Sequence, residues 1–184
     1  MIRSLLTAAS VGALVALPAF AEKHSSGEMP EIGDSGFVTA ARAEVTNREG
    51  TSVGTVTLNR TESGTTLVIV ALTDMPEGAH GIHLHETGDC SADDFTSAGG
   101  HIAGEADHGV FAANGPHPGD LPNASVQVDG VLSVEVFNGL LEIDSMVMDE
   151  DGAAFIVHAG PDDYITQSAG DAGDRIACGV FEPA

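Results

Sequence analysis

Residues 98–120 concentrate side chains that bind metal ions: His101, His108, His117 and Asp120. Six, eight and two residues separate these four, and the intervening glycines and prolines disfavour a long helix or strand. A loop of this length is uncommon in a compact domain unless something holds it. Three imidazoles and one carboxylate suit a closed, four-coordinate zinc site. The alternative is a polar surface loop that is merely rich in histidine.

Residues 81–86 contain two histidines, His83 and His85, with one residue between them. In a strand, alternate residues face the same side, so both imidazoles would share one face while Ile82 and Leu84 occupy the other. Two imidazoles on a rigid strand could supply half of a copper site. Such a pair also arises by chance at a protein surface, and this alternative stays open.

Three further side chains are candidates for the same chemistry. His158 ends an apolar segment, where a histidine is usually structural, but the presence of His83, His85 and the loop histidines makes it a candidate ligand. Asp162 is suited to accept N–H groups from ligating imidazoles and so fix their orientation. Arg175, three residues before Cys178, could bind a small anion, and a surface ion pair with a neighbouring aspartate is an equal alternative.

The chain is strongly acidic. It has 184 residues, 28 Asp and Glu against 6 Lys and Arg, and a formal net charge of -22. Its length suits one domain with a full core. This charge excludes affinity for nucleic acid or an anionic membrane as the default, and it repels anionic substrates at long range.

The N-terminus has the pattern of an export signal. Arg3, an apolar run and a small-residue site predict a signal peptide over residues 1–21, cleaved after Ala21, with an uncleaved anchor as the alternative. Residues 22–36 are polar and predict a flexible segment, in which His24 is a solvated residue. In an oxidising compartment, Cys90 and Cys178 predict one disulfide.

The elements that must position these residues are short strands. Segments rich in Val, Thr, Ile and Leu predict eight strands, at residues 37–46, 53–59, 65–73, 81–86, 124–128, 132–136, 154–158 and 175–181. No window has a convincing helical period. The pattern favours one all-β domain over residues 37–184, an antiparallel barrel or sandwich. Two long loops, residues 87–123 and 159–174, interrupt it, and long loops on a rigid scaffold often carry sites.

Together these motifs resemble a known family. The segments GIHLHETGDC, SAGGH, GPHPGDLPN, FIVHAGPDD and GDAGDRIACGV are similar, in order and nearly in spacing, to those of exported bacterial copper/zinc superoxide dismutases. The resemblance implies an eight-stranded antiparallel Greek-key β-barrel with two long functional loops. It assigns copper to His83, His85, His101 and His158, and zinc to His101, His108, His117 and Asp120, with His101 bridging both ions.

The resemblance also implies roles for neighbouring residues. Asp162 would link the copper ligand His83 to the zinc ligand His108, and Arg175 would guide superoxide. Cys90 and Cys178 would form the intrasubunit disulfide. His80 matches a structural histidine that is not a ligand. The chain departs from the family between His101 and His108, where six residues replace the usual seven.

The implied function is disproportionation of superoxide to oxygen and hydrogen peroxide by Cu(II)/Cu(I) cycling beside a zinc held by the bridging histidine. The expected compartment is the periplasm, and a homodimer is possible. Two rivals stay open at this point. An exported copper or zinc carrier on the same barrel would bind metal without turnover, and an adhesion-type β-sandwich would bind no metal.

Overall fold

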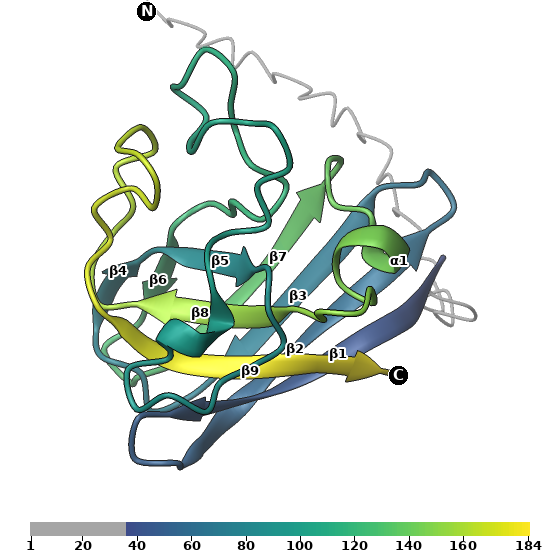
Figure 1. Cartoon of the computed structure of the whole chain (residues 1–184). Coiled ribbons are helices and arrows are strands. Elements are labelled where there is room, and N and C mark those ends of the chain that lie inside the picture. The colour runs from purple at the N-terminus through teal and green to yellow at the C-terminus, as the bar shows by residue number, and fades with distance from the viewer. Residues whose placement is uncertain (1–35) are drawn as a thin grey trace, which may run out of the picture. The chain divides into compact units, whose positions relative to one another are not determined.

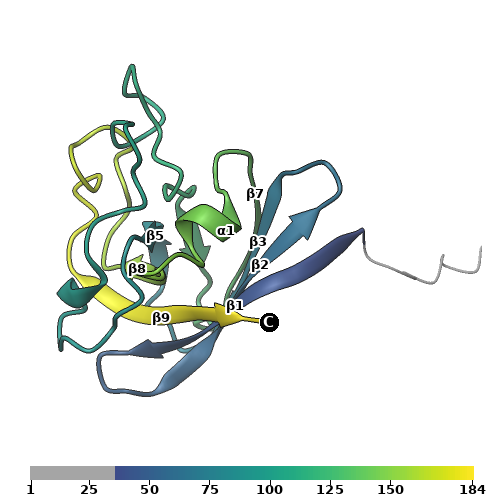
Figure 2. The ribbon, with the colours of Figure 1, turned by 45° about the vertical axis from the view of Figure 1, so that its right-hand side comes forward.

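The computed structural model describes residues 36–184, which form a curled antiparallel sheet with long loops on one side (Figures 1 and 2). The predicted signal peptide and residues 22–35 lie outside the described residues. The strands are β1 (Phe37–Asn47), β2 (Ser52–Thr61), β3 (Thr66–Leu72), β4 (Gly78–His80), β5 (Ile82–His85), β6 (Ala124–Val126), β7 (Leu132–Asn138), β8 (Ala154–His158) and β9 (Arg175–Pro183). Two single helical turns, η1 (Thr96–Ala98) and α1 (Ile143–Met146), complete the described part.

Seven strands form one antiparallel sheet in the order β5-β8-β9-β1-β2-β3-β7, and β4 pairs with β6 in a second, two-stranded sheet. Along β1 the inward residues Ala41, Ala43 and Val45 are fully buried and alternate with exposed neighbours, as expected for a sheet with one face exposed to solvent. The core is almost wholly aliphatic, and its fully buried members include Val56, Leu58, Val68, Val70, Ile82, Leu84, Phe155 and Val157.

The predicted all-β antiparallel fold is confirmed, with one difference in detail. The strand predicted at residues 81–86 is β5, and a short strand that was not predicted, β4, precedes it, so that Gly81 is the one residue between the two. There the chain leaves its partner β6 and joins β8, and the Gly81 N–H donates to Gly160 O at 2.8 Å. A Cβ at Gly81 would lie 3.0 Å from the Cβ of Ala172 and 3.2 Å from a carbon of the His83 ring. Hydrophobic pattern alone could not show this change of sheet, because the three residues of β4 (Gly78, Ala79 and His80) are too few to carry a pattern.

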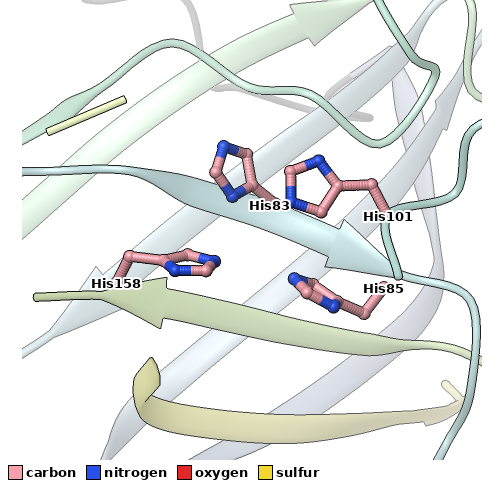
Figure 3. Close-up of side chains that lie close together, drawn as sticks. All are labelled: His83, His85, His101 and His158. Carbon is pink, nitrogen blue, oxygen red and sulfur yellow. The ribbon is translucent and has the colours of Figure 1, made fainter. Parts of the chain in front are cut away.

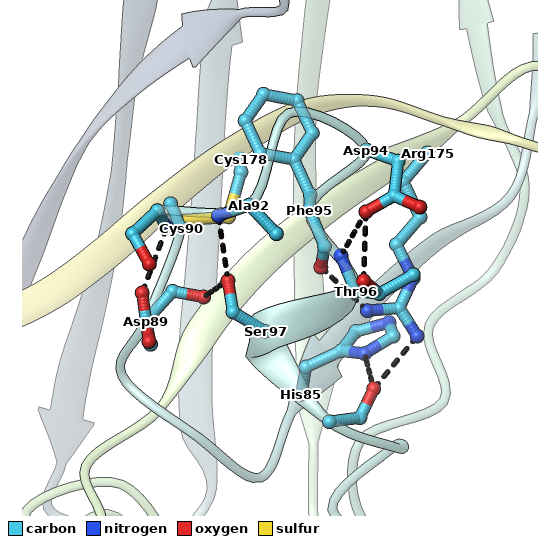
Figure 4. The surroundings of a disulfide bond; sticks show 12 residues. His85, Asp89, Cys90, Ala92, Asp94, Phe95, Thr96, Ser97, Arg175 and Cys178 are labelled. Carbon is cyan, nitrogen blue, oxygen red and sulfur yellow. Dashed lines mark hydrogen bonds between the residues drawn. A yellow bond between two sulfur atoms is a disulfide. The ribbon is translucent and has the colours of Figure 1, made fainter.

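Two long loops occupy residues 86–123 and 159–174, and we call them the first and second long loops. Figures 1 and 2 show them rising beside each other from the sheet. The predicted disulfide is present between Cys90 of the first long loop and Cys178 of β9, with a Cα–Cα distance of 6.0 Å (Figure 4). It joins the base of the first long loop to the sheet. Within residues 36–184, no helix has the length and apolar character needed to span a bilayer.

Candidate metal centre

Two groups of metal-binding side chains lie side by side under the long loops. The four-histidine cluster consists of His83, His85, His101 and His158, all buried, with one potential ligand atom from each within 4.8 Å of the others (Figure 3). The mixed cluster consists of His101, His108, His117 and Asp120 and meets the same criterion. His101 belongs to both, so the structure brings together all seven residues that the sequence nominated as metal ligands.

Strand β5 positions the four-histidine cluster. His83 and His85 project from the same face of β5, which pairs with β8 along one edge. Along its other edge the first long loop continues the sheet, because the Leu84 N–H donates to Gly119 O and Leu84 O accepts the Ile102 N–H, each at 2.9 Å. These bonds place His101 beside His85 and Asp120 beside His83, although the loop residues lie far along the chain.

One nitrogen of each ring in the four-histidine cluster is anchored. His85 Nδ1 lies 3.0 Å from Gly99 O, His158 Nδ1 lies 3.0 Å from Gly173 O, and His83 Nε2 lies 2.7 Å from Asp162 Oδ2. Each acceptor fixes the ring orientation and the tautomer, so the opposite nitrogen carries a lone pair.

The opposite nitrogens point at one another and are buried without a hydrogen-bond partner. They are His83 Nδ1, His85 Nε2, His101 Nε2 and His158 Nε2. A buried polar atom without a partner is destabilising by about 1–3 kcal/mol. Four of them converging on one point fit a bound cation with nitrogen preference, and they fit no hydrogen-bonded alternative because no donor lies among them.

Asp120 is the centre of the mixed cluster. Its Oδ1 lies 2.9 Å from His101 Nδ1, 3.0 Å from His108 Nδ1 and 3.3 Å from His117 Nδ1. Its Oδ2 accepts the backbone N–H groups of Gly109 and His117, at 2.8 and 3.0 Å. Three imidazole nitrogens and one carboxylate oxygen converging in this way fit a tetrahedral zinc site. His101 therefore directs Nε2 toward one cluster and Nδ1 toward the other.

Asp162 connects the two clusters by accepting a hydrogen bond from one histidine of each. Its side chain is fully buried and accepts from His83 Nε2 at 2.7 Å and from His108 Nε2 at 3.1 Å. Gly170 must be glycine here, because a Cβ would lie 1.9 Å from Asp162 Oδ1. Through Asp162, the orientation of a ring in one cluster is tied to the orientation of a ring in the other.

Comparisons with known proteins agree with the two candidate metal clusters found in the structure. The family model for copper/zinc superoxide dismutase (SODC) matches residues 52–181. The chain belongs to the copper/zinc superoxide dismutase family. The predicted family, its enzyme class and its two metals, copper and zinc, are confirmed at this level.

Individual relatives cover most of the chain. The protein named "Superoxide dismutase [Cu-Zn] 1" from Aquifex aeolicus (strain VF5) is 37% identical over 76% of this chain and 86% of its own length. The enzyme named "Superoxide dismutase [Cu-Zn]" from Caulobacter vibrioides is also 37% identical, over 78% of this chain and 86% of its own. The solved SOD-like protein from Bacillus subtilis has a TM-score of 0.73 at 33% identity, covering 78% of this chain and 99% of its own.

Burial keeps three imidazoles of the four-histidine cluster neutral. It lowers the pKa of His83 to about 3, of His85 to about 2 and of His158 to about 4. Burial alone would raise the pKa of Asp162, but hydrogen bonds from His83 and from the Tyr164 N–H outweigh it and lower that pKa to about 2. At neutral pH the rings are therefore in the form that binds metals, and the carboxylate behind them is charged.

Arg175 lies at the edge of the four-histidine cluster. Its Nη1 donates to Phe95 O and its Nη2 to Gly99 O, each at 2.7 Å, and Gly99 O also accepts from His85 Nδ1 (Figure 4). The predicted alternative, an ion pair with a neighbouring aspartate, is not formed. The other arginines of residues 36–184, namely Arg42, Arg48 and Arg60, each have a carboxylate within 4.0 Å, whereas Arg175 has none.

His80, the structural histidine of the sequence prediction, has no ring nitrogen available to bind a metal. Its Nδ1 lies 2.7 Å from His158 O and its Nε2 lies 2.9 Å from Pro76 O. Both partners are backbone carbonyls, so the ring links the segment before β4 to the end of β8 rather than facing a metal.

Sequence reasoning missed the residues that lock the two long loops together. Gln167 brackets His108, accepting its N–H at 2.8 Å and donating to its carbonyl at 3.0 Å. The Asn123 side chain makes two 2.8 Å bonds to the backbone of Asp162, and its N–H donates to the Tyr164 hydroxyl. Amide and phenol side chains with partners some 40 or more positions away leave no local signal, although Asn123 does end the quoted motif GPHPGDLPN.

Proposed function

We propose that this chain disproportionates superoxide, converting two superoxide anions and two protons into one oxygen and one hydrogen peroxide. The carrying observation is the shared ring of His101, whose two nitrogens enter two adjacent clusters with different ligand sets. A four-nitrogen site suits copper, whereas a site of three imidazoles and one carboxylate suits zinc. In this assignment copper is held by His83, His85, His101 and His158, and zinc by His101, His108, His117 and Asp120.

Bound copper supplies one-electron chemistry between Cu(II) and Cu(I), which zinc does not offer. Hydrogen bonds to Gly99 O, Gly173 O and Asp162 fix the rings of the three copper ligands other than His101, namely His85, His158 and His83. Electron transfer therefore requires little rearrangement of these three rings. Because one nitrogen cannot hold copper and a proton together, His101 Nε2 would carry one proton for the peroxide product only while it is released from copper, with the ring still held through Nδ1 in the mixed cluster. Water supplies the second proton.

Arg175 is the residue to which we assign the binding of superoxide. Its guanidinium carries a charge that no carboxylate within 4.0 Å neutralises, and its two carbonyl contacts hold it near His85. The net charge of -22 opposes an approaching anion, but at physiological salt the Debye length is about 8 Å. Charges near the site therefore outweigh the distant acidic surface.

We assign the activity to an exported compartment, the bacterial periplasm. The disulfide between Cys90 and Cys178 supports this, because such bonds persist in oxidising compartments. The sequence pattern of residues 1–21 supports it independently. N-terminal sequencing of the protein from a periplasmic extract should begin at Glu22, and recovery of the intact chain from the cytoplasm alone would contradict the assignment.

The test of function joins metal content to turnover. The protein loaded with copper and zinc should contain one of each and consume superoxide, as followed by pulse radiolysis. His158→Gln should lose copper and turnover but keep zinc, and His117→Gln should lose zinc affinity but still bind copper, so each variant controls for the folding of the other.

Two results would reject the proposal. Stoichiometric metal without turnover above that of free copper would indicate the carrier, and a chain that binds neither metal would indicate a structural module.

A further inference from the structure

Arg175 is held through its backbone as well as through its side chain. The terminal nitrogens of its guanidinium donate to Phe95 O and Gly99 O of the first long loop (Figure 4). At the other end of the residue, the Arg175 carbonyl accepts the Nε–H of Arg48 at 2.7 Å. Arg48 lies 127 positions away in the sequence, in the turn between β1 and β2.

The turn between β1 and β2 presents Arg48 from a well-ordered base. The side-chain oxygen of Asn47 accepts the N–H groups of Glu49 and Thr51, at 3.2 and 2.9 Å, and asparagine is favoured in turns because it can make such bonds. Strands β1 and β9 lie side by side (Figure 1), and at this end their last residue pair is Asn47 with Ala177. Arg48 is therefore the first residue beyond the paired strands, and its side chain continues the contact with β9.

Three consecutive carbonyls lead into Arg175, and each has a different donor. They are Gly173 O, Asp174 O and Arg175 O. His158 Nδ1 lies 3.0 Å from the first, the Ala159 N–H donates to the second at 2.7 Å, and the Arg48 Nε–H donates to the third. The first two donors come from the end of β8, whereas Arg48 comes from the side of β1. The start of β9 is thus held from both of its neighbours in the sheet.

The hydrogen bond of Arg48 matters more here than its charge. Arg48 Nη1 lies 3.9 Å from Asp174 Oδ2, and the Asp174 side chain is 81% exposed. An exposed ion pair of this length is strongly screened by water and salt. The Nε–H bond, by contrast, fixes a backbone atom of the residue that carries the anion-binding guanidinium, and a displacement of about 1 Å can greatly weaken the action of a positioned group.

We infer that Arg48 is a positioning residue for anion binding beside the four-histidine cluster, and that it acts through Arg175. This inference rests on the proposed function, because it takes Arg175 as the group that binds the anion. Phe95 O and Gly99 O fix the guanidinium end of Arg175, and the Arg48 bond fixes its backbone end. Without Arg48, the side chain would be held at one end only.

The test is the affinity of azide, a small anion that ligates Cu(II), for the copper- and zinc-loaded protein, followed by optical absorption. Arg48→Met removes both donor and charge and should weaken azide binding about 2- to 10-fold, as expected for the loss of one hydrogen bond. Arg48→Gln removes the charge but carries its amide nitrogen at the position of Nε, so it should bind azide nearly as well as the wild type. Arg48→Lys keeps the charge but has a methylene at that position, so it should resemble Arg48→Met.

Two controls separate this role from a general effect on the fold. Arg42→Met makes the same change at an arginine of β1 that is paired with Glu44, and it should leave the azide affinity unchanged. Arg48→Met should add no further loss to Arg175→Ala, because the residue through which it acts has already been removed. Metal content and the Cu(II) electron paramagnetic resonance spectrum should be the same in the wild type and in every Arg48 variant.

The inference would be overturned by wild-type azide affinity in Arg48→Met, or by an Arg48→Gln variant that binds azide as weakly as Arg48→Met. A further loss in the double variant would also overturn it, since Arg48 would then act independently of Arg175. Each of these results leaves the proposed role of Arg175 standing. An unchanged azide affinity in Arg175→Ala would instead reject both that role and the inference.

Discussion

Replacing Arg175 tests whether a single local charge decides catalysis in a strongly acidic protein. An anion about 5 Å from the guanidinium gains roughly 1–3 kcal/mol, for effective dielectric constants between those of water and a protein surface. The half-buried position of Arg175 and its lack of a carboxylate within 4.0 Å place it within this range. Arg175→Ala should therefore lower the rate constant with superoxide about 5- to 150-fold.

The assay is pulse radiolysis over a range of ionic strength, with metal content measured on the same samples. The wild-type rate should fall as salt is added, because screening weakens the attraction by Arg175, and the Arg175→Ala rate should depend less on salt. Arg60→Ala removes the same charge from a residue that is paired with Asp144 and exposed, so it should keep the wild-type rate.

Arg175 also bonds to Phe95 O and Gly99 O, so its removal loosens the loop beside His85. Arg175→Lys separates the two effects, because lysine keeps the charge but cannot reproduce the two-pronged contact. Recovery of most of the rate in Arg175→Lys would assign the loss to charge. A full rate in Arg175→Ala with normal metal content, or an equal loss in Arg60→Ala, would refute the reasoning.

Three further predictions concern the site and its support. Asp162→Asn should lower the affinity for both metals 10- to 100-fold in competition titrations, because two ring orientations depend on this carboxylate, and loss of only one affinity would contradict the link. Replacing Cys90 and Cys178 by serine should reduce the free energy of unfolding by about 4–5 kcal/mol in urea titrations, since the bond closes a loop across 88 positions, and an unchanged midpoint would show that the bond is dispensable. The metal-free protein should lose stability as the pH falls below about 6.5, because His83, His85 and His158 become protonated in the unfolded state but stay neutral in the folded state. Each of these histidines should lower the free energy of unfolding by about 1.4 kcal/mol per pH unit. An unfolding midpoint that does not change between pH 4 and 7 would contradict this prediction.

The candidate ligand residues could be nominated from sequence because their chemistry is local and their spacing is distinctive. His83 and His85 share a strand face by simple alternation, and the glycine-rich segment around His101 and His108 resembles a loop held by a metal. The convergence of the two groups could not be derived in this way. It depends on the bonds between Leu84 and the first long loop, which join backbone groups and leave no trace in side-chain pattern.

Arg175 shows where sequence reasoning leaves a choice that only coordinates resolve. An arginine among four nearby aspartates of the second long loop suggests a surface ion pair as readily as an anion site. In the structure its terminal nitrogens instead donate to two carbonyls of the first long loop, and its charge stays unpaired. Neutral acceptors can position a guanidinium without cancelling its field, and a sequence does not reveal which acceptor a side chain will reach.

The same reasoning explains how an acidic chain can attract an anion. Within residues 36–184, Arg42, Arg48 and Arg60 each lie beside a carboxylate, so at a distance their charges are largely cancelled. Among the arginines that the structure describes, Arg175, beside the four-histidine cluster, is the one without such a partner. Because the Debye length at physiological salt is about 8 Å, we expect an anion at the mouth of the site to respond mainly to that charge, and to metal ions when they are bound, rather than to the total of -22. Adding acidic residues far from Arg175 should therefore change the superoxide rate less than removing Arg175 alone.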